Sequence, residues 1–311
     1  MPENHIFKTP ILFLIYKRPD TTARVFEILR KVQPKHLFVA ADGPVSEKPG
    51  ERERCEAARK IIDNVDWDCN VKKLFRQKNL GCKIAVSSAI TWFFDNVEEG
   101  VILEDDCLPD PSFFIFCQDL LQYYRNDKRI SMISGNNFQK GIIRGTGSYY
   151  FSKHPHIWGW ATWRRAWENY DVNMATFPLF STTNQLANVF TNTYEQKYWN
   201  RLLDKTYRGE IDTWDYQWFH TVWEQNGLSI TPNDNLVSNI GYGSQATRTK
   251  GEQNILANLD TQRLDKIIHP KFILACKEAD DYDFISRFRG HKKKKIRLRK
   301  KLGKIFQISE N

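Results

Sequence analysis

The first hundred residues alternate between short apolar runs and stretches with helical periodicity. The apolar runs cover residues 11–16, 37–41 and 100–103, and a further strand pattern covers 71–75. The helical patterns between these strands cover 19–32, 51–64 and 82–96. Continuous apolar runs of this length are typical of strands that are buried on both faces. Repeated strand–helix units favour a mostly parallel sheet that is covered by helices. The sequence therefore predicts an α/β fold for this part of the chain.

The second half of the chain is less regular. Helical patterns occur at 113–125, 199–207 and 216–225, and short strand patterns at 130–134, 228–231 and 236–240. Residues 241–253 are polar and contain glycine, which is typical of a loop. The 311 residues suffice for one large α/β domain with an extension, and a hydrophobic content of 41% allows a sizeable core.

The net charge of +9 comes from one C-terminal segment. Residues 291–304 hold nine Lys or Arg residues and no acid, and outside this segment the 37 remaining basic residues equal the 37 acidic ones. A nucleic-acid-binding domain more often carries its basic residues on the folded face. The distribution therefore argues against a DNA or RNA partner.

The sequence predicts a cytoplasmic protein. Its six cysteines are scattered without a Cys-x-x-Cys pair, so they show neither zinc spacing nor a disulfide framework. The run at 11–16 is too short for a secretory signal, and no stretch reaches the roughly 20 apolar residues of a membrane span.

The basic tail, residues 291–311, leads to a second prediction about where the protein is located. Four of its apolar residues fit one helix face, namely Leu298, Leu302, Ile305 and Phe306. A basic amphipathic helix can lie on an anionic membrane surface, which predicts a peripheral position on the inner face of the cell membrane. A disordered, solvated tail is the alternative.

Polar residues follow each of the four predicted strands of the first half. They are Lys17-Arg18, Asp42-Gly43, Arg76 to Asn79, and Glu104-Asp105-Asp106. In open α/β sheets, ligands bind beyond the carboxyl ends of the strands. We therefore expect these four clusters to converge on one site.

The three adjacent acids Glu104, Asp105 and Asp106 predict a metal site. Because the chain turns where a strand ends, two of the three can face the same ligand. Mn²⁺ or Mg²⁺ binds few protein carboxylates and completes its shell with phosphate oxygens. Such a metal would neutralise the charge that develops on a departing diphosphate. A solvated acidic turn is the structural alternative.

The segment around these acids resembles a known family. Residues 100–114 read Gly-Val-Ile-Leu-Glu-Asp-Asp-Cys-Leu-Pro-Asp-Pro-Ser-Phe-Phe. This segment resembles the acidic motif of GT-A glycosyltransferases, above all the N-acetylglucosaminyltransferase I family. The chain is also similar to bacterial glycosyltransferase-2-like sugar-nucleotide transferases. The similarity spans residues 8–245 and is strongest over 79–137.

The resemblance implies a division of the chain. Residues 1–250 would form the GT-A domain, a Rossmann-like, mostly parallel sheet flanked by helices. Its nucleotide-sugar-binding half would cover 6–137, and its acceptor and catalytic-base half 138–250. Residues 251–290 would be a C-terminal helical extension, followed by the basic tail.

The resemblance also implies roles for single residues. Asp106 would be the metal ligand, and Glu104 and Asp105 would contact the ribose or the donor sugar. Asp42 would accept a hydrogen bond from the base. The donor-binding set would also include Arg18, Arg76 and Asn79. For Arg18 and Asp42, a surface cation and a turn-forming residue are the structural alternatives.

A catalytic base is expected in the segment Asp212-Thr213-Trp214-Asp215-Tyr216-Gln217-Trp218. By the resemblance, Asp215 is the carboxylate that takes the proton of the acceptor hydroxyl, and Asp212 is the competing candidate. An acid at the first turn of a helix also stabilises unpaired N–H groups, so a purely structural role for Asp215 stays open.

Two further segments are expected near the ligand. In the stretch 154–163, the resemblance places Trp160 beside a sugar, whereas Trp163 and Trp167 are predicted core residues of a helix. His154 and His156 have no carboxylate or Cys at ligand spacing, which argues against zinc. In the loop 241–249, Arg248 stands where many GT-A enzymes have a metal-binding His, and it could bind the diphosphate.

The function predicted from these features is transfer of a sugar, such as GlcNAc or another hexose, with inversion. The donor would be a nucleotide diphosphate sugar, most simply a UDP-sugar. The acceptor would be a glycan or a lipid-linked glycan in surface polysaccharide or glycoconjugate synthesis. Two alternatives stay open: a nucleotidyltransferase or phosphohydrolase that uses the same acids, and a GT-A-like glycan-binding module without activity.

Overall fold

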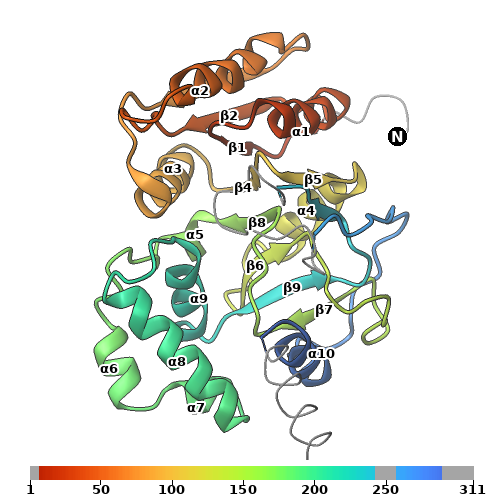
Figure 1. Ribbon diagram of the computed structural model, residues 1–311. Coiled ribbons are helices and arrows are strands. Elements are labelled where there is room, and N and C mark those ends of the chain that lie inside the picture. Colours follow the sequence, from red (N-terminus) through yellow and green to blue (C-terminus); the bar gives the residue numbers. More distant parts are fainter. Residues whose placement is uncertain (1–6, 242–256, 289–311) are drawn as a thin grey trace, which may run out of the picture.

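The computed structural model describes residues 7–241 and 257–288 (Figure 1). Its main feature is an eight-stranded sheet with the order β3-β2-β1-β4-β8-β6-β9-β7. The strands are β1 Ile11–Ile15, β2 His36–Ala41, β3 Asn70–Phe75, β4 Glu99–Glu104, β6 Ile130–Ser134, β7 Tyr149–Ser152, β8 Trp160–Trp163 and β9 Leu228–Pro232. Only β8 and β7 pair antiparallel with their neighbours, so the sheet is mostly parallel. A separate two-stranded sheet pairs β5, Cys107–Pro109, with β10, Val237–Asn239.

Helices flank this sheet, which confirms the predicted α/β class. They are α1 Pro19–Val32, α2 Glu51–Lys60, α3 Gly81–Asn96, α4 Ser112–Tyr123, α5 Arg164–Trp167, α6 Phe177–Thr182, α7 Leu186–Val189, α8 Thr193–Tyr207, α9 Asp215–Glu224 and α10 Lys277–Asp283. A 3-10 turn at Ile61–Asn64 extends α2, and a π-helical turn at Phe284–Phe288 extends α10. In the described part of the chain, no helix has both the length and the apolar character needed to cross a bilayer.

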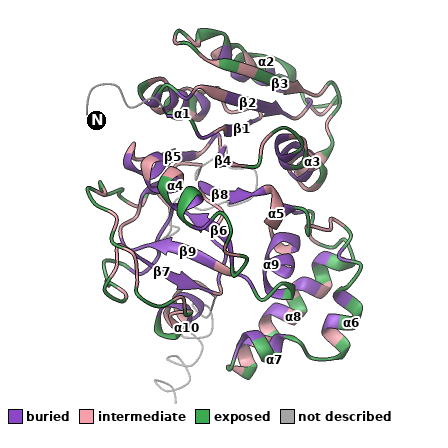
Figure 2. Cartoon of the chain, turned by 180° about the vertical axis from the view of Figure 1, so that it is seen from behind, coloured by how far each residue is buried: buried purple, intermediate pink, exposed green. Residues whose placement is uncertain are grey.

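The apolar strands are buried because helices cover both faces of the sheet (Figure 2). In β1, Phe13 packs into the core beneath α1 and α4, whereas Leu12 and Leu14 pack into the core beneath α3, α8 and α9. Successive side chains of a strand point to opposite faces, so a continuous apolar run is what two covered faces require.

The register of the parallel strands brings their carboxyl ends together. Ile15 of β1 lies opposite Ala41 of β2, and Leu14 lies opposite Glu104 of β4. Ala41 in turn lies opposite Phe75 of β3. The polar clusters that follow these strands therefore leave the sheet at one edge.

The segment 160–167 corrects one prediction. Trp160–Trp163 forms strand β8 between β4 and β6, and only Arg164–Trp167 is a helical turn. Trp163 and Trp167 are buried, as expected for core residues, but they do not share a helix face. Pairing with two strands outweighs the four-residue spacing that favoured a helix.

The region after residue 256 corrects another. Of the predicted helical extension 251–290, the structure describes residues 257–288; within these, 257–276 form no helix, and helix appears only in α10 and the following π-helical turn. The segment runs along β7, where the backbone N–H of Cys276 donates to the carbonyl of Phe151 at 2.7 Å. Because β7 is an edge strand of the sheet, this segment covers backbone groups that would otherwise be unpaired. The predicted tail, residues 291–311, lies outside the described residues.

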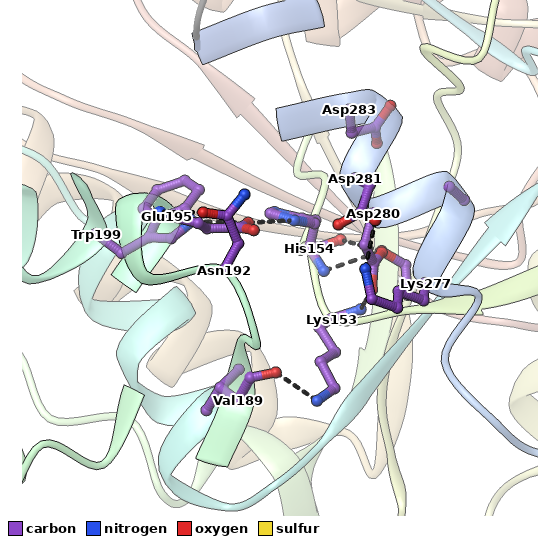
Figure 3. Close-up of polar contacts among 12 residues, drawn as sticks. Lys153, His154, Val189, Asn192, Glu195, Trp199, Lys277, Asp280, Asp281 and Asp283 are labelled. Atoms are coloured by element: carbon purple, nitrogen blue, oxygen red, sulfur yellow. Dashed lines mark hydrogen bonds and ion pairs between the residues drawn. The ribbon is translucent and has the colours of Figure 1, made fainter. Parts of the chain in front are cut away.

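A buried group of charged residues fixes α10 to the rest of the molecule (Figure 3). We call it the C-terminal clasp, and it consists of His154, His156, Glu195, Asp280 and Asp283, each at most 7% exposed. The His154 Nε2 lies 3.0 Å from the Glu195 carboxylate, and the His156 Nε2 lies 3.1 Å from that of Asp283. Asp280 accepts from the Ser152 hydroxyl at 2.5 Å. The two histidines thus have carboxylate partners that sequence spacing does not reveal.

Candidate active site

A pocket of about 480 Å³ opens at the carboxyl ends of the parallel strands. Its polar and aromatic lining residues include Tyr16, Lys17, Arg18, Asp42, Lys48, Arg76, Asn79, Glu104, Asp105, Asp106, Trp158, Asp212, Asp215, Asn239 and Gly241. All four polar clusters predicted to converge are represented, together with both candidate bases. The predicted convergence on one site is therefore confirmed.

Arg18 joins two of the three adjacent acids. Its guanidinium donates to the Asp105 carboxylate through Nη2 and to the Asp106 carboxylate through Nη1, the latter at 2.8 Å. Burial lowers the pKa of Arg18, but the Asp105 and Asp106 charges raise it by more, so it lies above its usual value. Asp105 is 2% exposed, and a carboxylate buried to this degree requires such a partner. Arg18 is thus a fixed part of the pocket wall, not a free surface cation.

The acids still carry more negative charge than Arg18 offsets. Burial, followed by the Asp106 charge, raises the pKa of Glu104 to about 8, even though Arg18 acts in the opposite direction. Burial also raises the pKa of Asp105 to about 6 against the effect of Arg18. Arg18 therefore neutralises only part of the negative charge of the three acids at the end of β4.

The start of β5 and the end of β10 shape the pocket around Asp106. The backbone N–H of Ile240 donates to the Asp106 carbonyl at 2.8 Å, which continues the pairing of the two strands. A Cβ atom at Gly241 would lie 2.1 Å from the Asp106 Oδ2. Only glycine allows the backbone to pass so close to this carboxylate.

Asp42 is held by the loop that leads into α3. Its carboxylate accepts from the backbone N–H groups of Gly43 at 2.8 Å and Leu80 at 2.9 Å. It also accepts from the Asn79 amide at 2.9 Å and the Gly81 N–H at 3.2 Å. Burial raises its pKa despite the backbone hydrogen bonds. Asp42 therefore organises a turn, which was the structural alternative, and it also lines the pocket.

The two candidate bases come from the start of α9 and from the segment that leads into it. Asp215 is the first residue of α9, and its Oδ1 accepts from the Tyr216 N–H at 3.1 Å and from the Thr213 hydroxyl. Its charge contributes to the raised pKa of Glu104, so the two carboxyls are neighbours. Asp212 approaches α3, since a Cβ at Gly81 would lie 3.5 Å from its Oδ2. Both carboxylates line the pocket, and the choice between them stays open.

Trp160 is not where the sequence placed it. It is 1% exposed and stacks on Trp214, with ring centroids 5.8 Å apart and Trp218 close by. Trp158 lines the pocket instead. The φ angle of +63° at Gly159 turns the chain between these two tryptophans, so only one can face the ligand space.

Several pocket residues carried no sequence prediction. Tyr16, Lys48 and Asn239 line the cavity. Tyr16 directly precedes the predicted Lys17-Arg18 cluster, so its position at a strand end could have indicated that it lines the pocket. Lys48 and Asn239 come from a turn and from a short strand, whose direction the sequence does not fix. Arg248 lies outside the described residues.

The residues of the pocket fit a divalent cation that is coordinated mainly by the phosphate oxygens of a bound substrate. Among the residues that the structure describes, no group of three or more His, Cys, Asp or Glu side chains is arranged to hold a metal ion. However, six acidic and four basic residues line the cavity, and a bound diphosphate would add further negative charge. Mg²⁺ and Mn²⁺ bound through phosphates need only one or two protein carboxylates. Asp106 at the pocket wall fits this requirement.

Comparison with known proteins finds likeness in structure only. No protein-family profile and no curated protein matches the sequence. A cytidylyltransferase from Leptospira borgpetersenii is similar at 19% identity and a TM-score of 0.33 over 54% of this chain. The chain spans 64% of the length of that protein.

Two other solved structures show likeness of the same extent. A 4-diphosphocytidyl-2C-methyl-D-erythritol synthase from Anaerococcus prevotii has 9% identity and a TM-score of 0.32, over 52% of this chain and 76% of its own. A UDP-glucose pyrophosphorylase has 11% identity and a TM-score of 0.26, over 51% and 71%. These enzymes are nucleotidyltransferases, the class of the alternative hypothesis, and not glycosyltransferases. Likeness at this level does not extend to a reaction.

Proposed function

We propose that the protein is a metal-assisted glycosyltransferase. It would move a hexose from a nucleotide diphosphate donor, a UDP-sugar, to a hydroxyl of a glycan or lipid-linked glycan in surface polysaccharide or glycoconjugate synthesis. The observation that carries the proposal is the composition of one cavity, which is lined both by the acids at the end of β4 and by the two candidate bases Asp212 and Asp215.

The cavity has the size and the groups that such a donor needs. Its volume of about 480 Å³ falls within the roughly 300–1,000 Å³ range of small-molecule sites. Lys17, Arg18 and Arg76 line it and can bind phosphate oxygens. The Trp158 ring can stack on the apolar face of a sugar or on a base.

The described residues also suit a metal that arrives with the donor. Asp106 would be its protein ligand, with the diphosphate oxygens as the remaining donors. When bound, the metal supplies positive charge that offsets the charge developing on the departing diphosphate. Arg18 holds the Asp105 and Asp106 carboxylates in place.

The transfer itself would be a single displacement. The acceptor oxygen forms a bond to the anomeric carbon while the bond from that carbon to the diphosphate oxygen breaks. Asp215 or Asp212 takes the proton of the acceptor hydroxyl. A single displacement inverts the configuration at the anomeric carbon.

A second candidate function is nucleotidyl transfer in the same pocket. That reaction requires a lysine near the phosphates, and the structure places Lys17 and Lys48 on the pocket wall. Attack would then occur at the α-phosphorus and would release or consume pyrophosphate, whereas glycosyl transfer releases the nucleoside diphosphate intact.

Product analysis separates the candidates. The full-length protein is incubated with UDP-sugars and Mn²⁺, with and without glycan acceptors, and the nucleotide products are identified. Release of UDP, reduced by about 100-fold or more in Asp106→Ala, supports glycosyl transfer. Formation of UTP and sugar 1-phosphate when pyrophosphate is added, or release of UMP and sugar 1-phosphate, supports the second candidate. Binding without turnover would indicate a glycan-binding module without activity.

Matched variants of the two candidate bases identify the proton acceptor. We expect Asp215→Asn to reduce transfer by about 100-fold while the donor Kd stays nearly unchanged, because the carboxylate acts on the acceptor. Asp212→Asn tests the competing candidate in the same way, and the variant that loses transfer while keeping donor affinity identifies the base. Equal losses of donor affinity and of turnover in Asp215→Asn would contradict its role as the base.

A further inference from the structure

Glu51 is a buried carboxylate directly behind the pocket wall. It is the first residue of α2, and its side chain is fully buried. Its Oε1 accepts from the Tyr16 hydroxyl at 2.6 Å and from the Val45 N–H at 2.9 Å. Its Oε2 accepts from the Lys17 ammonium at 2.7 Å. Two of these three donors belong to side chains that line the pocket.

The contacts of Glu51 continue along the wall on which a nucleotide would lie. The Tyr16 hydroxyl accepts from the Asn79 amide at 2.8 Å, and that amide also reaches the Asp42 carboxylate at 2.9 Å. The backbone N–H of Tyr16 donates to Asp105 at 3.1 Å. A chain of hydrogen bonds therefore runs from Glu51 through Tyr16 to the residues predicted to bind the donor.

The ionised state of Glu51 is stable in this position. Burial raises its pKa, but hydrogen bonds from Lys17 and Tyr16 lower it by more, to about 2. The negative charge restrains Lys17, a flexible side chain that would otherwise sample many rotamers. A side chain held in one place before binding loses less entropy when the ligand arrives.

An acid in the first turn also favours a helix, and this offers a purely structural explanation for Glu51. The chain provides its own control, because Glu53 is acidic, lies in the same first turn and is exposed. Removing either charge costs α2 the same interaction with its N-terminus. Only Glu51 contacts pocket residues.

We propose that Glu51 is a positioning residue, which fixes the Lys17 ammonium and the Tyr16 hydroxyl for the nucleotide diphosphate part of the donor. The inference rests on the proposed function in one respect, that a nucleotide diphosphate binds in this pocket. It assigns Lys17 to the phosphates and Tyr16 to the nucleoside side, where Asn79 and Asp42 lie.

Titration of UDP in the presence of Mn²⁺ tests the proposal by calorimetry. We expect Glu51→Gln to raise the Kd for UDP by about tenfold and Lys17→Met to do the same, with no further loss in the double variant because the two residues act as one unit. Glu53→Gln should bind as the wild type does. Circular dichroism and Tm confirm that each variant is folded.

An unchanged or tighter Kd in folded Glu51→Gln overturns the proposal, as does full additivity with Lys17→Met. If the wild-type protein fails to bind UDP, the proposed function fails by itself. In that case, crystal structures of the wild type and of Glu51→Gln test the positioning role of Glu51 independently of the proposed function. Lys17 and Tyr16 should leave their wild-type places in the variant, and retention of both places would overturn it.

Discussion

The pocket and the C-terminal clasp both enclose acidic side chains, but they differ in how the charge is matched. In the clasp, Glu195 and Asp283 each face an imidazole, and Asp280 accepts from a hydroxyl and a backbone N–H. In the pocket, six acidic residues stand against four basic ones around an open volume of about 480 Å³. None of the clasp residues lines that volume.

This difference separates a structural role from a functional one. Buried acids that each have a partner on a neighbouring segment hold elements together, as the clasp joins α10 and α8 to the chain at and just after β7 (Figure 3). Acids that remain in excess around a cavity raise each other's pKa and need a cation from outside. An excess of acids around an open cavity, and not the presence of buried acids as such, indicates the binding site.

The largest effect is expected in the clasp. Asp283→Asn removes a carboxylate that faces His156 and accepts from the Gln139 amide at 2.6 Å, and leaving buried donors without their partner costs about 1–3 kcal/mol of unfolding free energy for each. Urea denaturation measures the loss. Asp281→Asn is the control on the same helix, since its partner Lys277 is exposed and such pairs contribute less than about 1 kcal/mol. Equal stability of the two variants would contradict the assignment of the clasp as structural.

A smaller effect is expected at the wall of the pocket. Gly241→Ala would place a methyl group 2.1 Å from the Asp106 Oδ2 and 2.8 Å from the Arg18 Nη1. Displacing these groups should lower kcat/KM by about 10- to 100-fold, because catalytic groups tolerate little misplacement. Steady-state kinetics measure this, with Tm as a check on folding. Wild-type kinetics in this variant would show that Asp106 does not act from its present place.

The smallest expected effect has the opposite sign to that in the clasp. Because burial raises the pKa of Glu104 to about 8, this carboxyl must take up a proton when the protein folds at neutral pH. Glu104→Gln removes that cost, so it should stabilise the metal-free protein by about 0.5–2 kcal/mol while turnover falls. Chemical denaturation at neutral pH in the presence of EDTA provides the measurement. Glu56→Gln on the exposed side of α2 is the control, with little expected change. A clear loss of stability in Glu104→Gln would mean that the pocket acids are as well matched as those of the clasp.

Local patterns in the sequence were sufficient to predict the pocket for a physical reason. Continuous apolar runs define strands buried on both faces, and parallel strands end at the same edge, so Arg18, Asp42 and Asp106 had to converge. Trp160 could not be placed in this way. Its orientation depends on the pairing of β8 with β4 and β6 and on the positive φ of Gly159.

Contacts between residues far apart in the chain could not be predicted from the sequence either. Glu195 and Asp283 lie 41 and 127 residues from their histidine partners, so no spacing rule connects them. Residues 257–276 pack as an extended segment because β7 is an edge strand, and that fact follows only from the complete sheet order. Local periodicity predicts elements, whereas pairing at a distance depends on the assembled fold.

Calorimetric titration of UDP into the protein, with Mn²⁺ and with EDTA, tests the central claim most directly. The account predicts one site, tight binding only with Mn²⁺, and loss of that metal dependence in Asp106→Asn, which keeps the shape of the side chain but not its charge. Equal affinity with Mn²⁺ and with EDTA, or wild-type behaviour of Asp106→Asn, would contradict it.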